Sequence, residues 1–178
     1  MESAFSVPQD VTFQEAIALT QSLLDRLESE ALSESELESA ISQLVASENG
    51  ARGFFVTYLT DDREFADRPH PAAIQALKSS PLIVAELLVK NLAMSTAMEI
   101  THQRHNDPEM AAGSRRVQRR SAGLMERLAN PEIHQKVNAL LANIQTGTGD
   151  YQTFLERWQY DSQQKEAIAL ALKPFAME

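Results

Sequence analysis

Four polar residues recur at helical spacing within a strongly apolar stretch of the sequence. We define them as the polar column: Asn91, Ser95, Glu99 and His102. At about 100° per residue they share one side of a helix, and the apolar residues around them predict that this side is buried. A buried polar group costs about 1–3 kcal/mol when it lacks a hydrogen bond. The column therefore indicates either a hydrogen-bonded core network or the lining of a ligand site.

The last two residues of the column also match a metal-binding pattern. Glu99 and His102 have the Glu-x-x-His spacing that places a carboxylate and an imidazole on one helix face, as in di-iron carboxylate bundles. Those bundles need a second such pair and two further glutamates, and the sequence holds no second Glu-x-x-His. A metal-binding or redox role centred on Glu99 and His102 is therefore an alternative, and we predict neither a bound metal nor another cofactor.

A second group of residues with chemical potential is basic. We define it as the arginine ridge: Arg115, Arg116, Arg119 and Arg120. The ridge lies on the polar side of a predicted amphipathic helix that has Val117 and Leu124 on its apolar side. No Asp or Glu stands three or four residues from any of the four. Two pairs of them are like charges at i,i+4, each unfavourable by about 0.2–0.5 kcal/mol, so their counter-charge must come from elsewhere in space.

Three sources of counter-charge fit the arginine ridge. The first is the chain itself, through an acidic stretch that holds Glu28, Glu30, Glu34, Glu36 and Glu38. The second is the acidic surface of a protein partner, including the same stretch of a second copy. The third is RNA, because a guanidinium group suits phosphate as well as carboxylate. No aromatic residue is interleaved with the arginines for base stacking, which disfavours single-stranded nucleic acid.

The charge of the whole chain is acidic and uneven. The 178 residues carry a net charge of −9; residues 1–62 hold 12 acids and 2 bases, 63–130 hold 7 and 10, and 131–178 hold 6 and 4. A protein that coats nucleic acid with its whole surface is normally basic, so this distribution favours a local basic site. The absence of cysteine excludes disulfides, iron–sulfur ligation and thiol catalysis.

The sequence contains no complete catalytic constellation. His70 stands beside prolines without a nucleophile nearby, and Gly147-Thr-Gly149 is too short for a phosphate loop. The N-terminus lacks a basic segment followed by an apolar run, and the longest apolar run, 82–89, is far shorter than the roughly 20 residues that span a bilayer. We therefore expect a non-enzymatic cytoplasmic protein without membrane insertion, acting in protein–protein interaction, assembly or regulation through the arginine ridge.

The elements that position these residues are all predicted to be helical. Capping boxes at Thr12 and Ser33 predict one helix over 12–30 and a second that Asn49-Gly50 ends. The run at 53–60 is strand-like in composition, but nothing exists for it to pair with, so we predict a helix. Prolines in the first turn predict four further helices, at 71–79, 81–105, 108–129 and 131–146. Turn residues near 147–150 and 161–162 separate two more helices, at 151–159 and 162–173.

These elements define an all-α fold. We predict a single-domain multi-helix bundle over 1–178, with about seven to nine helices packed around the central apolar helix at 81–105. Within it, 1–50 forms an acidic N-terminal helical pair and 51–178 supplies the core helices. We expect one polar stripe of the central helix to be its solvent-facing side: Glu86, Lys90, Thr101 and Arg104.

Two segments resemble a known family. "RGFFVTYLTDD" at 52–62 and "VKNLAMSTAMEITHQRH" at 89–105 are similar to segments of an uncharacterised helical protein family of cyanobacteria and other photosynthetic organisms. The resemblance implies a soluble cytoplasmic or stromal protein. It includes no motif with assigned chemistry, so it implies no catalytic residue.

Overall fold

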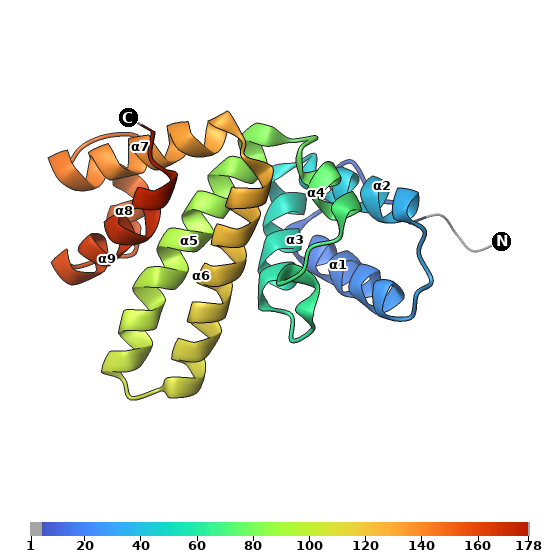
Figure 1. The fold of residues 1–178 in the computed structure, drawn as a ribbon, viewed down its shortest axis with the longest axis horizontal. Coiled ribbons are helices and arrows are strands. Elements are labelled where there is room, and N and C mark those ends of the chain that lie inside the picture. The colour runs from blue at the N-terminus through green and yellow to red at the C-terminus, as the bar shows by residue number, and fades with distance from the viewer. Residues whose placement is uncertain (1–4, 178) are drawn as a thin grey trace. The chain divides into compact units, whose positions relative to one another are not determined.

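The structure is a computed structural model that describes residues 5–177. Within these residues every regular element is helical, with nine α-helices and two short 3-10 helices and no strand (Figure 1). The predicted all-α class and the predicted number of helices are therefore confirmed.

The chain divides into two compact units, the first ending at Leu87 and the second beginning at Leu88. The division falls inside α5 (Pro81–Arg104), whose bounds agree with the predicted helix at 81–105 to within one residue. Buried residues of α5 lie in both units, Val84 in the first and Leu88 in the second, so α5 is a core helix. That the whole chain forms one domain stays a prediction.

Helix α5 also resembles a membrane span in its length and composition. Half of its most apolar 18-residue window is buried inside the structure. A helix that is apolar around most of its circumference is usually part of a core, so length and composition alone do not make α5 a membrane span.

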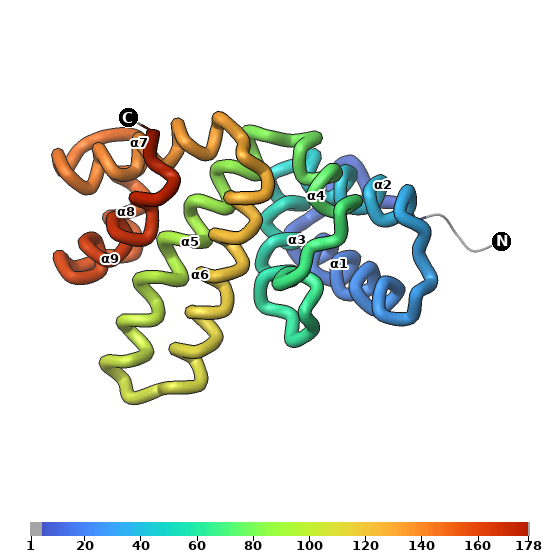
Figure 2. The backbone as a smooth tube through the Cα atoms, in the orientation of Figure 1, coloured from blue at the N-terminus to red at the C-terminus, as the bar shows by residue number. Residues whose placement is uncertain are grey.

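The first unit contains α1 (Phe13–Glu28), α2 (Glu34–Val45), α3 (Glu48–Thr60), the 3-10 helix η1 (Glu64–Ala66) and α4 (Pro71–Leu77). Helix α1 packs against α3, and α2 packs against both α3 and α4 (Figure 2). Both predicted capping boxes are present, with Thr12 bonded reciprocally to Glu15 and Ser33 to Glu36. The segment at 53–60 is helical as predicted.

One predicted boundary is wrong. Asn49 and Gly50 do not end the second helix, because α2 already ends at Val45 and both residues lie in the first turn of α3. The Ser47 hydroxyl accepts a hydrogen bond of 3.1 Å from the Gly50 amide and so begins α3. A Cβ atom on Gly50 would lie 2.1 Å from the Leu44 carbonyl oxygen. Gly50 therefore permits the close approach of two successive helices instead of stopping one.

The second unit contains the C-terminal part of α5 together with α6 (Pro108–Leu128), α7 (Pro131–Thr146), α8 (Gln152–Arg157), α9 (Ser162–Leu172) and the 3-10 helix η2 (Lys173–Phe175). Helices α5 and α6 run antiparallel, side by side, joined by a short turn (Figure 1). Helix α7 packs against α9 and η2. Prolines occupy the first positions of α6 and α7, as predicted.

The polar stripe of α5 is only partly exposed in this unit: Arg104 is exposed, whereas Lys90 and Thr101 are half-buried. Thr101 Oγ1 accepts a hydrogen bond of 3.0 Å from Gln164 of α9, and Arg104 Nη1 donates one of 2.6 Å to Asp161, the N-cap of α9. Lys90 Nζ lies 5.6 Å from the centre of the Phe154 ring in α8. The stripe is therefore solvent-facing only in part, because a polar face can pack against polar partners as well as against water.

Candidate functional site

The α5–α6 hairpin brings the polar column and the arginine ridge together. The turn between the two helices passes through Asn106, which has a positive φ of 55°. In an antiparallel hairpin, residues at equal distances from the turn lie opposite each other. Glu99 on α5 therefore contacts Arg115 on α6. Ser95 lies near Gln118, one helical turn further away from the loop that joins the two helices.

Glu99 is the centre of this contact. Its Oε1 atom accepts hydrogen bonds from Arg115 Nη1 at 2.9 Å and from Gln103 Nε2 at 3.2 Å. Its Oε2 atom accepts one of 2.7 Å from Gln118 Nε2. The Glu99 side chain is only 19% exposed, so its negative charge is compensated by donors of both helices. The carboxylate opposite Arg115 thus comes from the polar column itself.

The other residues of the column have different surroundings. Ser95 is buried, and its hydroxyl donates a hydrogen bond of 2.6 Å to the carbonyl oxygen of Asn91, one turn earlier in α5. The Ser95 carbonyl oxygen also lies 3.3 Å from Gln118 Nε2. Asn91 and His102 are half-buried, and His102 stands in the last turn of α5. The structure therefore brings Ser95 and Glu99 together around one glutamine of α6.

Glu99 and His102 share no hydrogen bond or ion pair in the described part of the chain. Among residues 5–177, no group of three or more His, Asp or Glu side chains is arranged to hold a metal ion. The carboxylate of the Glu-x-x-His pair, that of Glu99, already accepts three hydrogen bonds from neighbouring side chains.

The arginine ridge divides into an exposed and a more buried part. Arg115 and Arg119 are exposed, with 51% of the Arg115 side chain accessible to solvent. Arg116 is half-buried and Arg120 is only 2% exposed, which the sequence did not predict. The cause is helical geometry, because Arg120 lies one turn before the buried Leu124 at the edge of the apolar side. Arg116, Arg119 and Arg120 also have interaction partners in the structure.

The acidic stretch of the first unit is partly engaged. Glu28 accepts a hydrogen bond of 3.1 Å from Arg63, Glu36 caps α2, and Glu34 lies 3.7 Å from the His70 imidazole. Glu34 and Glu38 are exposed and stand at i,i+4 on α2, so they form a like-charge pair on one side of that helix. We define these two residues as the acidic pair.

Two glutamines that join helices of the second unit were not predicted from the sequence. Gln118 bridges α6 to α5, and Gln164 bridges α9 to α5 through hydrogen bonds to Ala97 and Thr101. A search for acids within four residues of each arginine cannot find a partner on another helix. The short turn between the two long helices was the available signal, since it fixes which residues of α5 face α6.

The class defined by these observations is an all-α protein with a polar network between two long antiparallel helices. The family model of the Uncharacterised conserved protein UCP020893 matches residues 12–175, and the chain belongs to this family. The match begins at the N-cap of α1 and ends in η2, and so includes both units. Neither the curated proteins nor the solved structures compared with the chain gave a match.

Proposed function

We propose that this chain is a non-enzymatic protein-interaction module that associates with a second copy of itself. In the proposed contact, Arg115 and Arg119 of one copy pair with the acidic pair, Glu34 and Glu38, of the other. The arginine ridge is thereby reduced to its two exposed members. An assembly or regulatory role follows from such self-association.

The proposal rests on Arg115, whose side chain is both held by an ion pair and exposed to solvent. Its guanidinium group is fixed by Glu99 at 2.9 Å, yet about half of the side chain stays exposed. A guanidinium group has five N–H donors in a planar fork, so one carboxylate does not use its full capacity. Because Glu99 already orders the side chain, a second carboxylate would bind with a smaller entropy cost.

The two like-charge pairs match each other in spacing. Arg115 and Arg119 are one turn apart on α6, and Glu34 and Glu38 are one turn apart on α2. Each pair is unfavourable by about 0.2–0.5 kcal/mol on its own helix. Contact between the pairs of two copies would add an attraction to each pair, beyond the partners that its residues already have within one chain. Under two-fold symmetry the same contact would form twice, which would double the gain from each residue.

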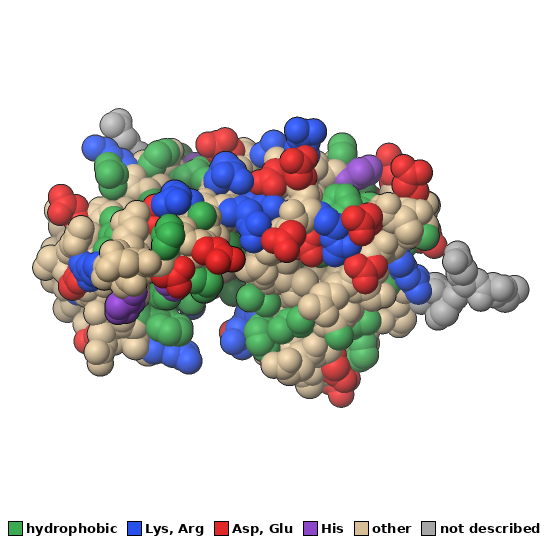
Figure 3. Space-filling view, turned by 90° about the horizontal axis from the view of Figure 1, so that it is seen from below, with side chains coloured by type: hydrophobic (Ala, Val, Ile, Leu, Met, Phe, Trp, Pro, Cys, Tyr) green, Lys and Arg blue, Asp and Glu red, His purple; other side chains and the backbone are tan. Residues whose placement is uncertain are grey.

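RNA binding through Arg115–Arg120 and metal or ligand binding at Glu99 and His102 are the alternatives. Burial of Arg120 reduces the basic surface that phosphates could reach. The face drawn in Figure 3 carries acidic side chains among the basic ones, which differs from the uniform basic surface of many nucleic-acid-binding proteins. At the alternative metal or ligand site, the Glu99 carboxylate already accepts hydrogen bonds from three side chains. A cytoplasmic location and an origin in photosynthetic organisms stay predictions from the sequence.

Sedimentation velocity of the purified chain at increasing protein concentration tests the proposal. We expect reversible self-association that weakens as salt is added, because exposed ion pairs are screened. The variant Arg115→Gln/Arg119→Gln should remain monomeric at concentrations where the parent associates. A control with the same change in charge, Arg127→Gln/Arg157→Gln, replaces two other exposed arginines and should associate like the parent. A parent that stays monomeric at low salt would refute self-association.

A further inference from the structure

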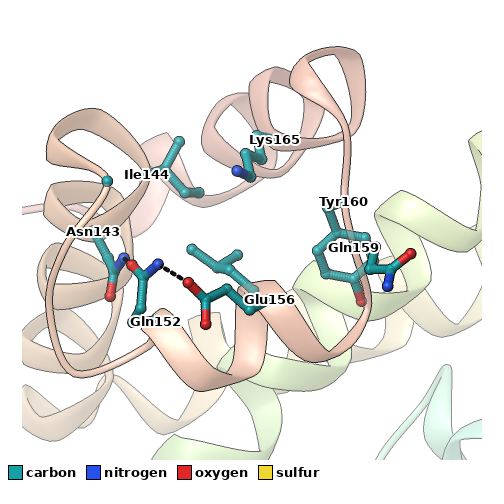
Figure 4. Close-up of a pocket in the computed structure, with 9 residues that line it drawn as sticks. Asn143, Ile144, Gln152, Glu156, Gln159, Tyr160 and Lys165 are labelled. Carbon is teal, nitrogen blue, oxygen red and sulfur yellow. Dashed lines mark hydrogen bonds between the residues drawn. The ribbon is translucent and has the colours of Figure 1, made fainter.

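The second unit contains a cavity of about 310 Å³ that is unrelated to the α5–α6 hairpin. It is lined by the end of α7, by α8 and by the start of α9 (Figure 4). This volume is at the lower end of the roughly 300–1,000 Å³ found for ligand pockets. A cavity of this size suits a small molecule.

The floor and the mouth of the cavity differ in burial. Asn143, Leu155 and Tyr160 are buried and form the floor, whereas Glu156 and Gln159 are exposed at the mouth. Tyr160 is 7% exposed, and its ring packs edge-on against Phe154 with the ring centres 6.1 Å apart. Burial raises the pKa of Tyr160 to about 12, so its hydroxyl keeps its proton at neutral pH and can donate a hydrogen bond.

A chain of amides fixes the carboxylate at the mouth. The buried Asn143 accepts a hydrogen bond of 2.8 Å from the Tyr151 amide and donates one of 3.1 Å to Gln152 Oε1. Gln152 in turn donates to the Glu156 carboxylate. Gly149 allows this arrangement, because its φ is 142° and a Cβ atom there would lie 2.9 Å from Asn143 Oδ1. Glu156 is therefore held from a buried anchor.

The opposite wall is also fixed, and it carries the opposite charge. Lys165 belongs to α9, which is bonded to α5 through Gln164 and through the Asp161–Arg104 ion pair. Figure 4 shows Lys165 and the Gln152–Glu156 pair on opposite sides of the cavity. In the described structure no ion pair joins Lys165 to Glu156. Two opposite charges thus line one small cavity without neutralising each other.

We propose that this cavity binds a small zwitterion of the size of a free amino acid. The carboxylate of the ligand pairs with Lys165, and its ammonium group pairs with Glu156. Tyr160 and the amide of Gln159 offer hydrogen bonds to the remaining polar atoms. Glu156 is already held by Gln152 before a ligand enters, and α9 carries Lys165 on a fixed helix, so mainly the Lys165 side chain has to be ordered on binding.

Trp158 provides a direct measurement. It is the only tryptophan of the chain, and it directly precedes Gln159 and Tyr160 of the cavity. The probes are the common free L-amino acids, each added at up to about 10 mM, the range that detects millimolar dissociation constants. Trp158 fluorescence and amide NMR shifts of Gln159, Tyr160 and Lys165 are followed for each probe. We expect saturable shifts with at least one amino acid.

Blocked ligands and charge variants identify the mode of binding. The N-acetyl derivative and the carboxamide of the active amino acid each lack one charge, so each should bind at least about tenfold more weakly than the amino acid itself. The variants Lys165→Gln and Glu156→Gln should likewise bind the active amino acid at least about tenfold more weakly than the parent does. The controls Lys173→Gln and Glu166→Gln remove exposed charges outside the lining and should bind like the parent. Unchanged thermal midpoints show that the variants are folded.

Three results would overturn the proposal. The first is the absence of a saturable shift with every amino acid. The second is unchanged affinity of a blocked ligand or of a folded Lys165→Gln or Glu156→Gln variant. The third is binding of acetate or inorganic phosphate as tight as that of the amino acid, which would show an anion site at Lys165 alone.

Discussion

Arg63 in the first unit and Arg115 in the second illustrate two ways in which an acidic protein uses arginine. Arg63 donates to Asp61, Asp25 and Glu28, with N···O distances of 2.8 to 3.1 Å, and its side chain is 23% exposed. Those carboxylates raise the pKa of Arg63 above its ordinary value. Arg115 donates to one carboxylate and is about half exposed. Arg63 is bonded to three carboxylates of its own unit, whereas the guanidinium group of Arg115 can still donate hydrogen bonds to a further carboxylate.

The difference follows from where the acids stand. The loop after α3 carries Asp61 close to Arg63 in sequence, and the end of α1 adds Asp25 and Glu28. Arg63 therefore ties that loop to α1. On α6, no acid lies within one turn of Arg115, so α5 provides Glu99 alone. The first arrangement is a structural clamp, and the second leaves a preorganised cation at the surface.

The largest expected effect is loss of the clamp. Arg63→Met keeps much of the apolar stem but removes hydrogen bonds to three carboxylates, and we expect it to lower the free energy of unfolding by about 2 kcal/mol. Arg68→Met is the control, because Arg68 is highly exposed and lies 3.8 Å from Glu64. Its effect should stay within about 0.5 kcal/mol. Equal effects in urea denaturation would show that the clamp does not stabilise the first unit.

Loss of the Glu99 charge is expected to have an intermediate effect. Glu99→Gln removes the ion pair with Arg115 and weakens the hydrogen bond from Gln118, so the free energy of unfolding should fall by about 1 kcal/mol. Glu126→Gln, at an exposed position of α6, should change it by much less. A Glu99→Gln variant as stable as the parent would mean that the network contributes nothing to stability.

Acid should weaken the fold through carboxylates that the structure keeps ionised. The Arg104 guanidinium holds the pKa of Asp161 below its ordinary value of 3.8, and the bonds to Thr12 and Ser33 do the same for Glu15 and Glu36. A carboxyl with a lowered folded pKa binds fewer protons when folded than when unfolded. Its stabilisation is therefore complete above the ordinary pKa and disappears as the pH falls through the folded value.

Urea midpoints measured from pH 7 down to about pH 3 test this sign, and the decrease should begin near the ordinary carboxyl pKa values. Asp161→Asn keeps an N-cap for α9 but has no charge to lose, so its midpoint should depend less on pH than that of the parent. The same pH dependence in both proteins would show that the Arg104–Asp161 pair does not contribute.

Local signals in the sequence were sufficient for the helices, because capping boxes and first-turn prolines act within four residues. They failed where a residue has two uses, as at Gly50, which permits close helix packing and does not end a helix. The sequence identified the residues of the candidate site but not their contacts. Glu99 and Arg115 were both identified, yet their pairing depends on the register of a hairpin.

Other features depend on packing between elements far apart in the sequence. The Arg63 clamp joins Arg63 to residues 35 or more positions away, and the cavity of the second unit is lined by parts of three helices. Burial of Arg120 and contact of the polar stripe with α9 also depend on which helix becomes the neighbour. Periodicity shows which side of a helix is polar, but it does not show whether water or another helix faces that side.

The central claim is that the exposed arginines of α6 in one copy bind the acidic pair of α2 in another, and mixing of charge-swapped chains tests it most directly. One variant is Arg115→Gln/Arg119→Glu, and the other is Glu34→Lys/Glu38→Lys. In sedimentation velocity each variant alone should be monomeric, because its two contact surfaces no longer attract each other. An equimolar mixture should form a heterodimer, because the unchanged acidic pair of the first variant again faces the unchanged Arg115 and Arg119 of the second. A mixture that remains monomeric, or single variants that associate like the parent, would contradict the proposed contact.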